Sequence, residues 1–472
     1  MSARLLDDCL TVFRRWLFLD DPAPLYAVAA AVAANLAPGD PVWLLLVAPP
    51  STGKTEVLQS VSPLPYVHPV ATLTEPALLS GSPKKDVSKQ ATGGMLRQVG
   101  DFGVLLAKDF TSVLSMQRDS RSQVLAALRE IYDGSWDRPV GADGGNVLHW
   151  DGKCGLIGGV TPVLDRHHAV IAGLGDRFIL LRLPDVDPAS TGALALAHVG
   201  YERQMRQELA DAMSGLVAGA DISMVSRALT AQENARLIAL ATYTVRARTG
   251  VERDGYTSEL LLMPQIEGPG RLVTALRRML GGLEAIGCDP DTAWSIVGRI
   301  AIDCVPAIRT ALIRVLLTDP HVALRTSAAA ERVGMVTRTA SRHLEDLALL
   351  GLATRTKKSE ADNSADLWSA SDWLIAHWPE STTEIPPPIH ETLVRDTGDP
   401  ESLSHLDGSN AQHPDSLSHP ADTRARGLAL PRMGSAAGRD VARARDGLGD
   451  VLTGRGLAQH PTCIPLQPTP TS

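Results

Sequence analysis

The chain has 472 residues, 44% hydrophobic and 21% charged, with a formal net charge of −8 from 45 Lys and Arg against 53 Asp and Glu. At roughly 150 residues per domain, this length predicts about three domains. The acidic balance excludes a histone-like coat protein, so any contact with nucleic acid must be local. The five cysteines form no Cys-x-x-Cys pair or Cys/His cluster. This spacing excludes a disulfide framework and a structural zinc site and indicates a reducing, cytoplasmic setting.

The first predicted element is an N-terminal helical segment, 1–40, in which apolar residues recur at helical spacing before Pro38 and Gly39 end it. Its longest apolar stretch, 25–37, is shorter than the ~20 residues that cross a bilayer. The beginning of the chain also lacks the basic-then-apolar pattern of a signal peptide. We therefore expect no membrane contact.

The next predicted unit, 41–187, changes to strand-like patterning. Short apolar runs at 42–47, 104–107, 155–160 and 178–183 alternate with helical stretches. Such runs, bounded by Gly, Pro and Asp, are typical of buried strands in a parallel sheet. The pattern predicts an α/β domain.

The strongest motif lies between the first of these runs and a helix start, and it has the spacing of a phosphate-binding loop. Its residues are Ala48, Pro49, Pro50, Ser51, Thr52, Gly53, Lys54, Thr55 and Glu56. Backbone N–H groups in such a loop converge on one point, Lys54 reaches the outer phosphates and the Thr55 hydroxyl ligates Mg²⁺. Ala48 stands where the motif usually has glycine. We expect ATP and Mg²⁺ as the ligands.

A second acidic element is expected at the end of another buried strand, and the run at 102–107 is followed by Lys108 and Asp109. The usual ending is Asp-Glu, in which one carboxylate supports Mg²⁺ and the other polarises the attacking water. Here Asp109 alone must support the metal or act as the base, and the sequence leaves this choice open. The alternative is a strand that simply ends in a solvated Lys-Asp pair.

With these two elements, residues 10–310 resemble an AAA+ ATPase of the helicase type, which includes the minichromosome-maintenance proteins. The resemblance implies that Thr161, before Pro162, is a polar sensor. It also implies that Arg177, in Gly-Asp-Arg-Phe, is an arginine finger that reaches a neighbouring subunit's nucleotide, and that Arg271 is a second sensor. The active form would then be a homo-oligomeric ring. A surface or ion-paired role is the alternative for each arginine.

Two further parts fit this resemblance. Helical periodicity alone runs through 188–310 and predicts a helical lid, while two strand-like runs around Asp-Gly-Gly predict a β-hairpin over 138–150. The family places such a hairpin against DNA, which makes Arg138, His149 and Lys153 candidates for phosphate contacts. An ordinary structural hairpin is the alternative.

The segment 311–378 predicts a helix-turn-helix with a strand-like hairpin and resembles the winged domains of MarR- and ArsR-type regulators. Gly334 permits the turn between the helices, and Gly351 ends the second one. The candidate DNA-binding residues are Thr337, Arg338, Thr339, Ser341, Arg342, Arg355, Lys357 and Lys358. Because Glu345, Asp346 and Glu360 offset these basic residues, a winged helix used only for protein contacts is the alternative.

The last segment, 379–472, has no aromatic residue, and residues 380–472 contain 11 of the 32 prolines, which predicts a disordered tail. The sequence as a whole predicts a DNA-dependent AAA+ ATPase, a helicase or helicase loader of replication or of a mobile element. The alternative is an ATP-gated winged-helix transcriptional regulator with little or no turnover. A weaker alternative is a signalling ATPase whose winged helix binds proteins.

Overall fold

The computed structural model describes residues 2–379 except 81–92, 141–145, 169–176, 255–256, 258 and 357–365. All of these described residues fall within one compact unit, Met1–Thr397. Apart from its first residue, the predicted tail 379–472 lies outside the described part of the chain.

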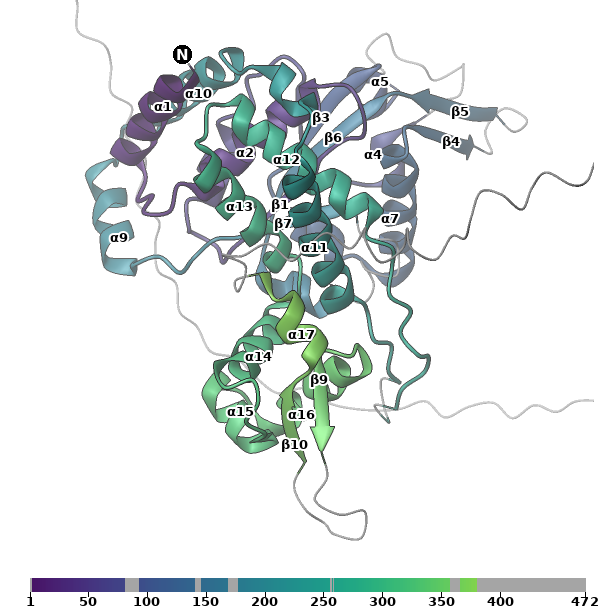
Figure 1. Ribbon diagram of the computed structural model, residues 1–472. Coiled ribbons are helices and arrows are strands. Elements are labelled where there is room, and N and C mark those ends of the chain that lie inside the picture. Colours follow the sequence, from purple (N-terminus) through teal and green to yellow (C-terminus); the bar gives the residue numbers. More distant parts are fainter. Residues whose placement is uncertain are drawn as a thin grey trace, which may run out of the picture. The chain divides into compact units, whose positions relative to one another are not determined.

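Strands within the described residues form three sheets (Figure 1). They are β1 (Trp43–Val47), β2 (Val67–Val70), β3 (Phe102–Ala107), β4 (Ser135–Val140), β5 (Asn146–Asp151), β6 (Lys153–Val160), β7 (Phe178–Arg182), β8 (Leu324–Arg325), β9 (Ala353–Thr356) and β10 (Leu367–Ala370). The largest sheet is parallel, in the order β2-β3-β6-β1-β7. The strands β4 and β5 form an antiparallel hairpin, and β8-β10-β9 form a small antiparallel sheet. The predicted α/β class with a parallel sheet is confirmed.

Helices make up most of the remaining described chain. They are α1 (Ser2–Trp16), α2 (Ala23–Leu36), α3 (Lys54–Gln59), α4 (Glu75–Leu78), α5 (Met95–Val99), α6 (Thr111–Leu114), α7 (Arg118–Tyr132), α9 (Pro188–Ala197), α10 (Glu202–Ala218), α11 (Ala231–Arg248), α12 (Gly270–Ala285), α13 (Pro290–Asp303), α14 (Ala307–Thr318), α15 (Thr326–Val333), α16 (Thr337–Leu349) and α17 (Asp372–His377), with short 3₁₀ helices η2 (Pro162–His167) and η3 (Ile222–Ser226). Within the described ranges, no helix combines the length and the apolar character needed to span a bilayer.

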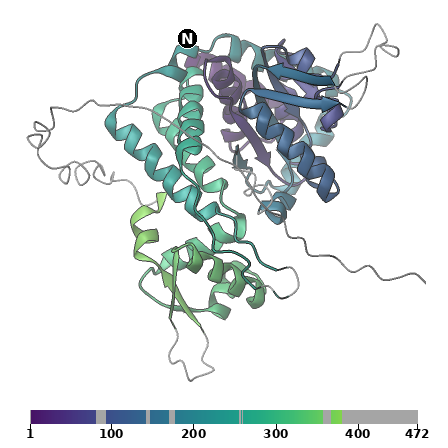
Figure 2. The same cartoon turned by 90° about the vertical axis from the view of Figure 1, so that its right-hand side faces the viewer.

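Helices cover both faces of the parallel sheet because successive side chains of a strand point to opposite faces (Figures 1 and 2). On one face, Trp43 of β1 packs against Tyr132 of α7, with ring centroids 5.2 Å apart. On the other face, Gly155 of β6 leaves room for Asn35 of α2, because a Cβ there would lie 2.7 Å from the Asn35 side chain. Asn35 is fully buried, and its amide bonds both the N–H and the C=O of Val42, which fixes α2 to the start of β1.

The buried apolar side chains form two clusters. The first joins the parallel sheet to α1, α2 and the helices α10 to α13, so the predicted segment 1–40 shares a core with the α/β unit. The second joins α14 to α17 with the end of α11, through residues such as Tyr243, Leu312 and Trp368. The predicted boundary at 310 therefore cuts through α14, and the cores change between α13 and α14.

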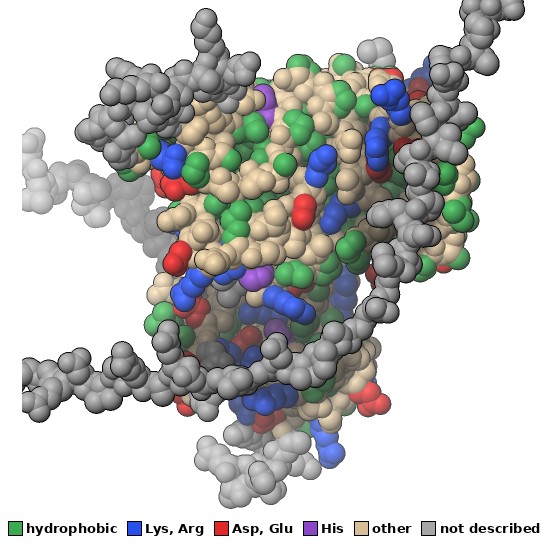
Figure 3. Space-filling view, turned by 180° about the vertical axis from the view of Figure 1, so that it is seen from behind, with side chains coloured by type: hydrophobic (Ala, Val, Ile, Leu, Met, Phe, Trp, Pro, Cys, Tyr) green, Lys and Arg blue, Asp and Glu red, His purple; other side chains and the backbone are tan. Residues whose placement is uncertain are grey.

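Charged side chains of both signs are interspersed with apolar ones on the face of the molecule drawn in Figure 3. This mixture agrees with the modest net charge of −8. A phosphate-binding surface must therefore come from particular side chains and backbone groups rather than from the field of the whole chain.

Candidate functional site

The parallel sheet brings three chain segments to one edge. The strand β6 lies between β1 and β3, and all three run in the same direction. Their carboxyl ends therefore meet, which places the loop after Val47, the Lys108-Asp109 pair and Thr161 side by side. Thr161 is the central member because its strand is the middle one.

The loop after β1 turns its backbone donors toward a common space. Gly53 has a φ of 79° and Ser51 a φ of 65°, and Ser51 is the one non-glycine residue with a positive φ among the described residues. A left-handed conformation costs a non-glycine residue about 1–2 kcal/mol, so the surrounding fold must hold it. Alternation of right- and left-handed residues makes successive N–H groups converge into a concave nest that suits anions.

Five consecutive amide groups in this loop remain available. Within the described residues, the N–H groups of 51–55 donate to no other protein group, whereas those of Ala48 and Glu56 bond Val160 and Gly53. Pro49 and Pro50 have no N–H to contribute. The open donors thus lie in the second half of the loop, next to the Lys54 side chain, and they line a cavity of about 640 Å³.

Lys54 is a buried cation, and its hydrogen-bond partners among the described residues are backbone carbonyls. Its residue is 8% exposed, and its Nζ donates to the carbonyl oxygens of Ala48 at 3.0 Å and Val160 at 2.9 Å. Burial lowers the pKa of Lys54, and the nearby Asp109 carboxylate opposes this shift. Neutral carbonyl partners leave the charge of Lys54 uncompensated by a direct ion pair, which suits the approach of an anion.

Thr111, which the sequence analysis did not single out, connects the segments that follow β3 and β6. Asp109 is exposed, and its Oδ1 accepts a hydrogen bond from the Thr111 N–H at 3.0 Å. The Thr111 hydroxyl accepts from the Thr161 N–H at 3.0 Å and lies 3.4 Å from the Thr161 hydroxyl. Thr111 therefore holds Asp109 and Thr161 at fixed positions on the cavity wall. A hydroxyl two residues after the acid is too common a pattern to signal this role.

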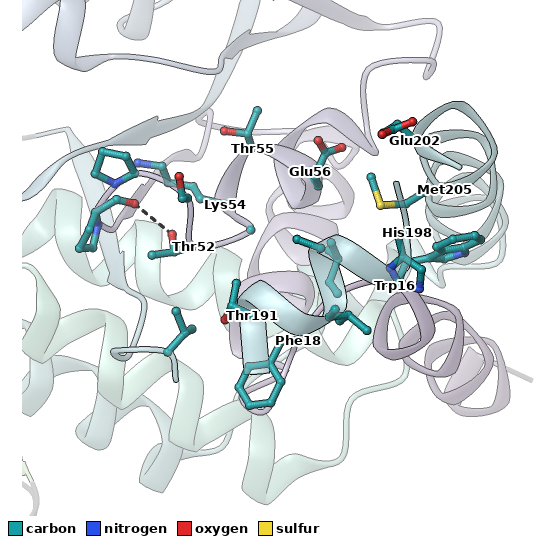
Figure 4. Close-up of a pocket in the computed structure, with 18 of the residues that line it drawn as sticks. Trp16, Phe18, Thr52, Lys54, Thr55, Glu56, Thr191, His198, Glu202 and Met205 are labelled. Carbon is teal, nitrogen blue, oxygen red and sulfur yellow. Dashed lines mark hydrogen bonds between the residues drawn. The ribbon is translucent and has the colours of Figure 1, made fainter. Parts of the chain in front are cut away.

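The far half of the cavity is largely apolar and comes from α1, α9 and α10. Figure 4 shows Trp16, His198 and Met205 across from the loop residues, and Phe18 also lines the cavity. Trp16 meets the ring of His198 edge-on at 4.7 Å between centroids. Its Nε1 donates to Glu208 at 2.7 Å, so the indole is fixed in place.

An arginine of α10 reaches the loop end of the cavity. Arg206 pairs with Glu56 through two hydrogen bonds of 3.1 and 3.2 Å, and both residues line the cavity. Glu56 thus has an ion-pair partner at the position where the motif predicted nucleotide contact. No sequence pattern could have indicated Arg206, because it follows Glu56 by 150 residues.

The predicted finger and second sensor, Arg177 and Arg271, lie away from this cavity. Arg177 precedes β7 at the edge where the strands begin, and its side chain is 5% exposed, 2.6 Å from Asp133 and over the Tyr132 ring. Arg271 is exposed on the first turn of α12. Burial raises the pKa of Tyr132 to about 12, and the charge of Arg271 opposes this shift. Neither residue lines the cavity.

These positions do not decide the two predicted roles. An arginine finger acts on a neighbouring subunit, and within its own chain Arg177 pairs with Asp133. The charge of Arg271 acts on Tyr132, which packs against Trp43 at the start of β1. Both roles stay predictions. Arg206 is the arginine of the helical region that lines the cavity.

The predicted hairpin forms as β4 and β5, but its candidate cations are largely occupied. Arg138 donates to the Leu79 carbonyl at 2.6 Å, and the Lys153 ammonium donates to the Ala37 carbonyl. Burial lowers the pKa of Lys153 to about 8. His149 lies exposed between Asp137 and Asp151, and hydrogen bonds to these carboxylates raise its pKa. The described hairpin thus presents acidic groups, which weakens the expected phosphate contacts.

The second core carries a helix-turn-helix arrangement. Gly334 ends α15 with a φ of 72°, and the Met335 N–H bonds back to the Ala330 carbonyl at 2.9 Å. This left-handed cap permits a three-residue turn into α16. Ala340, Leu344 and Leu347 on α16 are buried against α14 and α15, and β9 and β10 follow as an antiparallel pair.

The predicted DNA-binding side chains divide by position. The outward ones on α16 are Thr337, Arg338, Thr339 and Arg342, which are exposed, while Ser341 is half-buried and donates to Glu345. Arg355 on β9 is exposed and pairs with Asp366 at 2.6 Å. Lys357 and Lys358 lie outside the described residues.

Two of the acids weighed against these cations, Glu345 and Asp346, pair with arginines from other elements. Asp346 is 5% exposed and pairs with Arg253 at 2.8 Å and with Arg309 at 3.7 Å. Glu345 pairs with Arg253 at 3.4 Å. Arg253, from the segment after α11, and Arg309, from α14, thus pair with these carboxylates, and Arg338 and Arg342 are exposed on α16. Glu360 lies outside the described residues.

Searches against models of known protein families and against curated protein sequences returned no match for this chain.

Proposed function

We propose that the chain is an ATP-binding and DNA-binding ATPase, a helicase-like or helicase-loading protein. The nucleotide occupies the cavity at the end of β1, and DNA lies on the outer face of α16. The observation that carries this proposal is the run of five unpartnered amide groups beside the buried Lys54. A polyphosphate supplies the acceptors that these donors lack.

The two halves of the cavity suit the two ends of a nucleoside triphosphate. The loop amides and Lys54 hold the phosphates, and the apolar wall with Trp16, His198 and Met205 accommodates a base. A cavity of about 640 Å³ lies within the usual range for nucleotide-sized ligands. Thr161, held by Thr111, faces the outer phosphate and can read its presence.

Mg²⁺ fits this site only together with the phosphates. The described residues contain no group of three or more His, Cys, Asp or Glu side chains arranged to hold a metal. The Thr55 hydroxyl and the Asp109 carboxylate line the cavity, and Mg²⁺ is commonly bound by one or two such oxygens with phosphates and water. The ion would supply charge neutralisation between the outer phosphates.

DNA binding is supported by the exposed threonines and arginines at the beginning of α16. A helix that follows a tight turn and presents such side chains at its N-terminal end is typical of a recognition helix in the major groove. The carboxylates of Glu345 and Asp346 on the same helix pair with Arg253 and Arg309, and Arg338 and Arg342 are exposed. The β9–β10 pair stands in the place of the wing.

A second candidate function is an ATP-gated transcriptional regulator with little turnover. Two observations favour it: Asp109 is the one carboxylate directly after β3, and the Arg177 side chain is 5% exposed and pairs with Asp133 of its own chain. Both reduce the machinery available for fast hydrolysis. The ring remains an expectation from the family resemblance.

Titration with a fluorescent ATP analogue tests the nucleotide site. Lys54→Ala is expected to weaken binding at least tenfold, because a charge-assisted hydrogen bond contributes about 1.5–3 kcal/mol. Ser51→Gly keeps the amide and the positive φ, so it should bind as the parent does. Arg4→Ala removes a cation whose side chain is 90% exposed on α1 and serves as the matched control. Unchanged affinity in Lys54→Ala would contradict the proposal.

Turnover of ATP with and without DNA separates the two candidate functions. Strong stimulation by single- or double-stranded DNA supports the motor protein. Site-specific binding to duplex DNA with no stimulated turnover supports the regulator.

A further inference from the structure

The segment that follows Thr161 leads away from the cavity and is held by one arginine. The 3₁₀ helix η2 begins directly after Thr161, and its Asp165 accepts two hydrogen bonds from Arg182, of 2.7 and 2.9 Å. A bidentate pair fixes both the distance and the orientation of its partners. A displacement of η2 is therefore transmitted to Arg182.

Arg182 is also connected to the phosphate-binding loop. It is the last residue of β7 and lies in register beside Val47, the last residue of β1. The N–H of Leu183 donates to the Val47 carbonyl at 3.0 Å. The backbone of Arg182 thus moves with the strand that carries the loop, while its side chain holds the segment after the sensor.

The remaining donors of Arg182 reach the connection between the two cores. Its Nε donates to the Asp303 carbonyl at 3.0 Å, and a terminal nitrogen donates to the Val305 carbonyl at 3.3 Å. Its backbone N–H donates to the Asp303 carboxylate at 2.7 Å. Asp303 ends α13, and Val305 lies just before α14, the helix that packs against both α15 and α16.

The residue that follows η2 lies within the electrostatic influence of an arginine on α14. His168 follows η2 directly, and burial lowers its pKa to about 3, with the charges of Arg309 and Arg248 adding to the effect. Arg309 lies in the first turn of α14. It donates to the Ala247 and Thr249 carbonyls and pairs with Asp346 on α16. Asp165 within η2 thus bonds Arg182, and His168 after η2 is influenced by Arg309, which pairs with Asp346 on α16.

We propose that Arg182 couples occupancy of the nucleotide cavity to the DNA affinity of α16. This inference rests on the proposed function. A phosphate that contacts Thr161 shifts η2, the Asp165–Arg182 pair transfers that shift to the α13–α14 connection, and α14 carries it to α16. By reciprocity, DNA bound at α16 changes the affinity for nucleotide by the same factor.

The test compares DNA affinity with and without saturating ATPγS, using a short fluorescent duplex of mixed sequence at fixed salt. In the parent protein ATPγS should change DNA affinity at least about fivefold. In Arg182→Gln and Asp165→Asn, ATPγS should change the DNA affinity by less than about twofold. The DNA affinity and the ATPγS affinity, each measured without the other ligand, should stay within about threefold of the parent values. Asp165→Asn leaves the bonds of Arg182 to Asp303 and Val305 in place, so it serves if Arg182→Gln fails to fold.

Arg227→Gln is the matched control, because Arg227 also joins two carboxylates, Glu233 and Glu284, but touches neither η2 nor α14. It should retain the factor of the parent. An uncoupled parent protein, a coupled Asp165→Asn variant or loss of coupling in Arg227→Gln would overturn the inference and leave the proposed function intact. A parent protein that binds no nucleotide or no DNA would overturn the proposed function itself.

Discussion

The cavity at the end of β1 and the outer face of α16, the two proposed ligand sites, present charge in opposite ways. In the cavity, backbone amides converge around the buried Lys54, and side-chain carboxylates are few. On α16, the side chains of Arg338 and Arg342 point outward, and the acids of the same helix are paired inside. The first site depends on the path of the main chain and the second on side-chain identity. Substitutions should therefore affect the cavity mostly through conformation and α16 mostly through charge.

The largest effect is expected in the second core. Trp368 is fully buried, and its Nε1 donates to the Thr326 hydroxyl at 2.9 Å, which ties β10 to α15. Trp368→Ala should lower the free energy of unfolding by about 3–5 kcal/mol and abolish DNA binding. The affinity for nucleotide should stay within about threefold. Denaturant unfolding with both binding assays measures this, with Trp373→Ala at a partly exposed site as control.

Equal loss of nucleotide binding in Trp368→Ala would show that the two regions fold as one cooperative unit. The two regions would then differ in how their surfaces present charge, but not in their stability.

The next effect concerns pH. Burial raises the pKa of Asp303 from 3.8 to about 6. The native state therefore holds an extra proton between these values, and the contribution of this carboxyl to stability is lost as pH rises through about 6. From pH 4 to pH 7, the parent protein should lose up to about 3 kcal/mol relative to Asp303→Asn. Paired unfolding curves at both pH values measure this, and a constant difference would contradict the prediction.

Arg177 provides a test of a smaller effect. Arg177→Ala removes the pair with Asp133 and the contact with the Tyr132 ring, but Asp133 stays half-exposed. We expect a loss of about 1–3 kcal/mol in the free energy of unfolding. Arg118→Ala, on an exposed position of α7, should lose much less. Unchanged stability with abolished ATP turnover would instead support the predicted finger role.

The smallest expected effect is at the DNA face. Arg338→Ala combined with Arg342→Ala should weaken duplex binding about tenfold and reduce its salt dependence, while nucleotide affinity stays unchanged. Arg332→Ala removes an exposed cation of α15 and should bind DNA as the parent does. Fluorescence anisotropy at several salt concentrations gives both quantities. Equal losses in Arg332→Ala would indicate nonspecific attraction.

Local patterns allowed the parallel sheet, the loop and the helix-turn-helix to be predicted. The run before Ala48 is buried throughout, and Gly334 has the left-handed conformation that its turn requires. The partners of the arginines could not be predicted, because they depend on contacts between distant segments. Arg177 and Asp133 meet across 44 residues, and Arg206 and Glu56 across 150. The order of the motifs along the chain could be read from the sequence, but it did not indicate which arginine side chain lines the cavity.

The two prolines at the start of the loop have a thermodynamic consequence. Pro49 and Pro50 restrict the backbone in the unfolded chain as well as in the native one, and the Thr52 hydroxyl ties the loop by bonding the Pro49 carbonyl at 3.1 Å. Much of the ordering of this loop thus accompanies folding rather than ligand capture. Association should then carry a small entropic penalty and proceed without rearrangement of the loop.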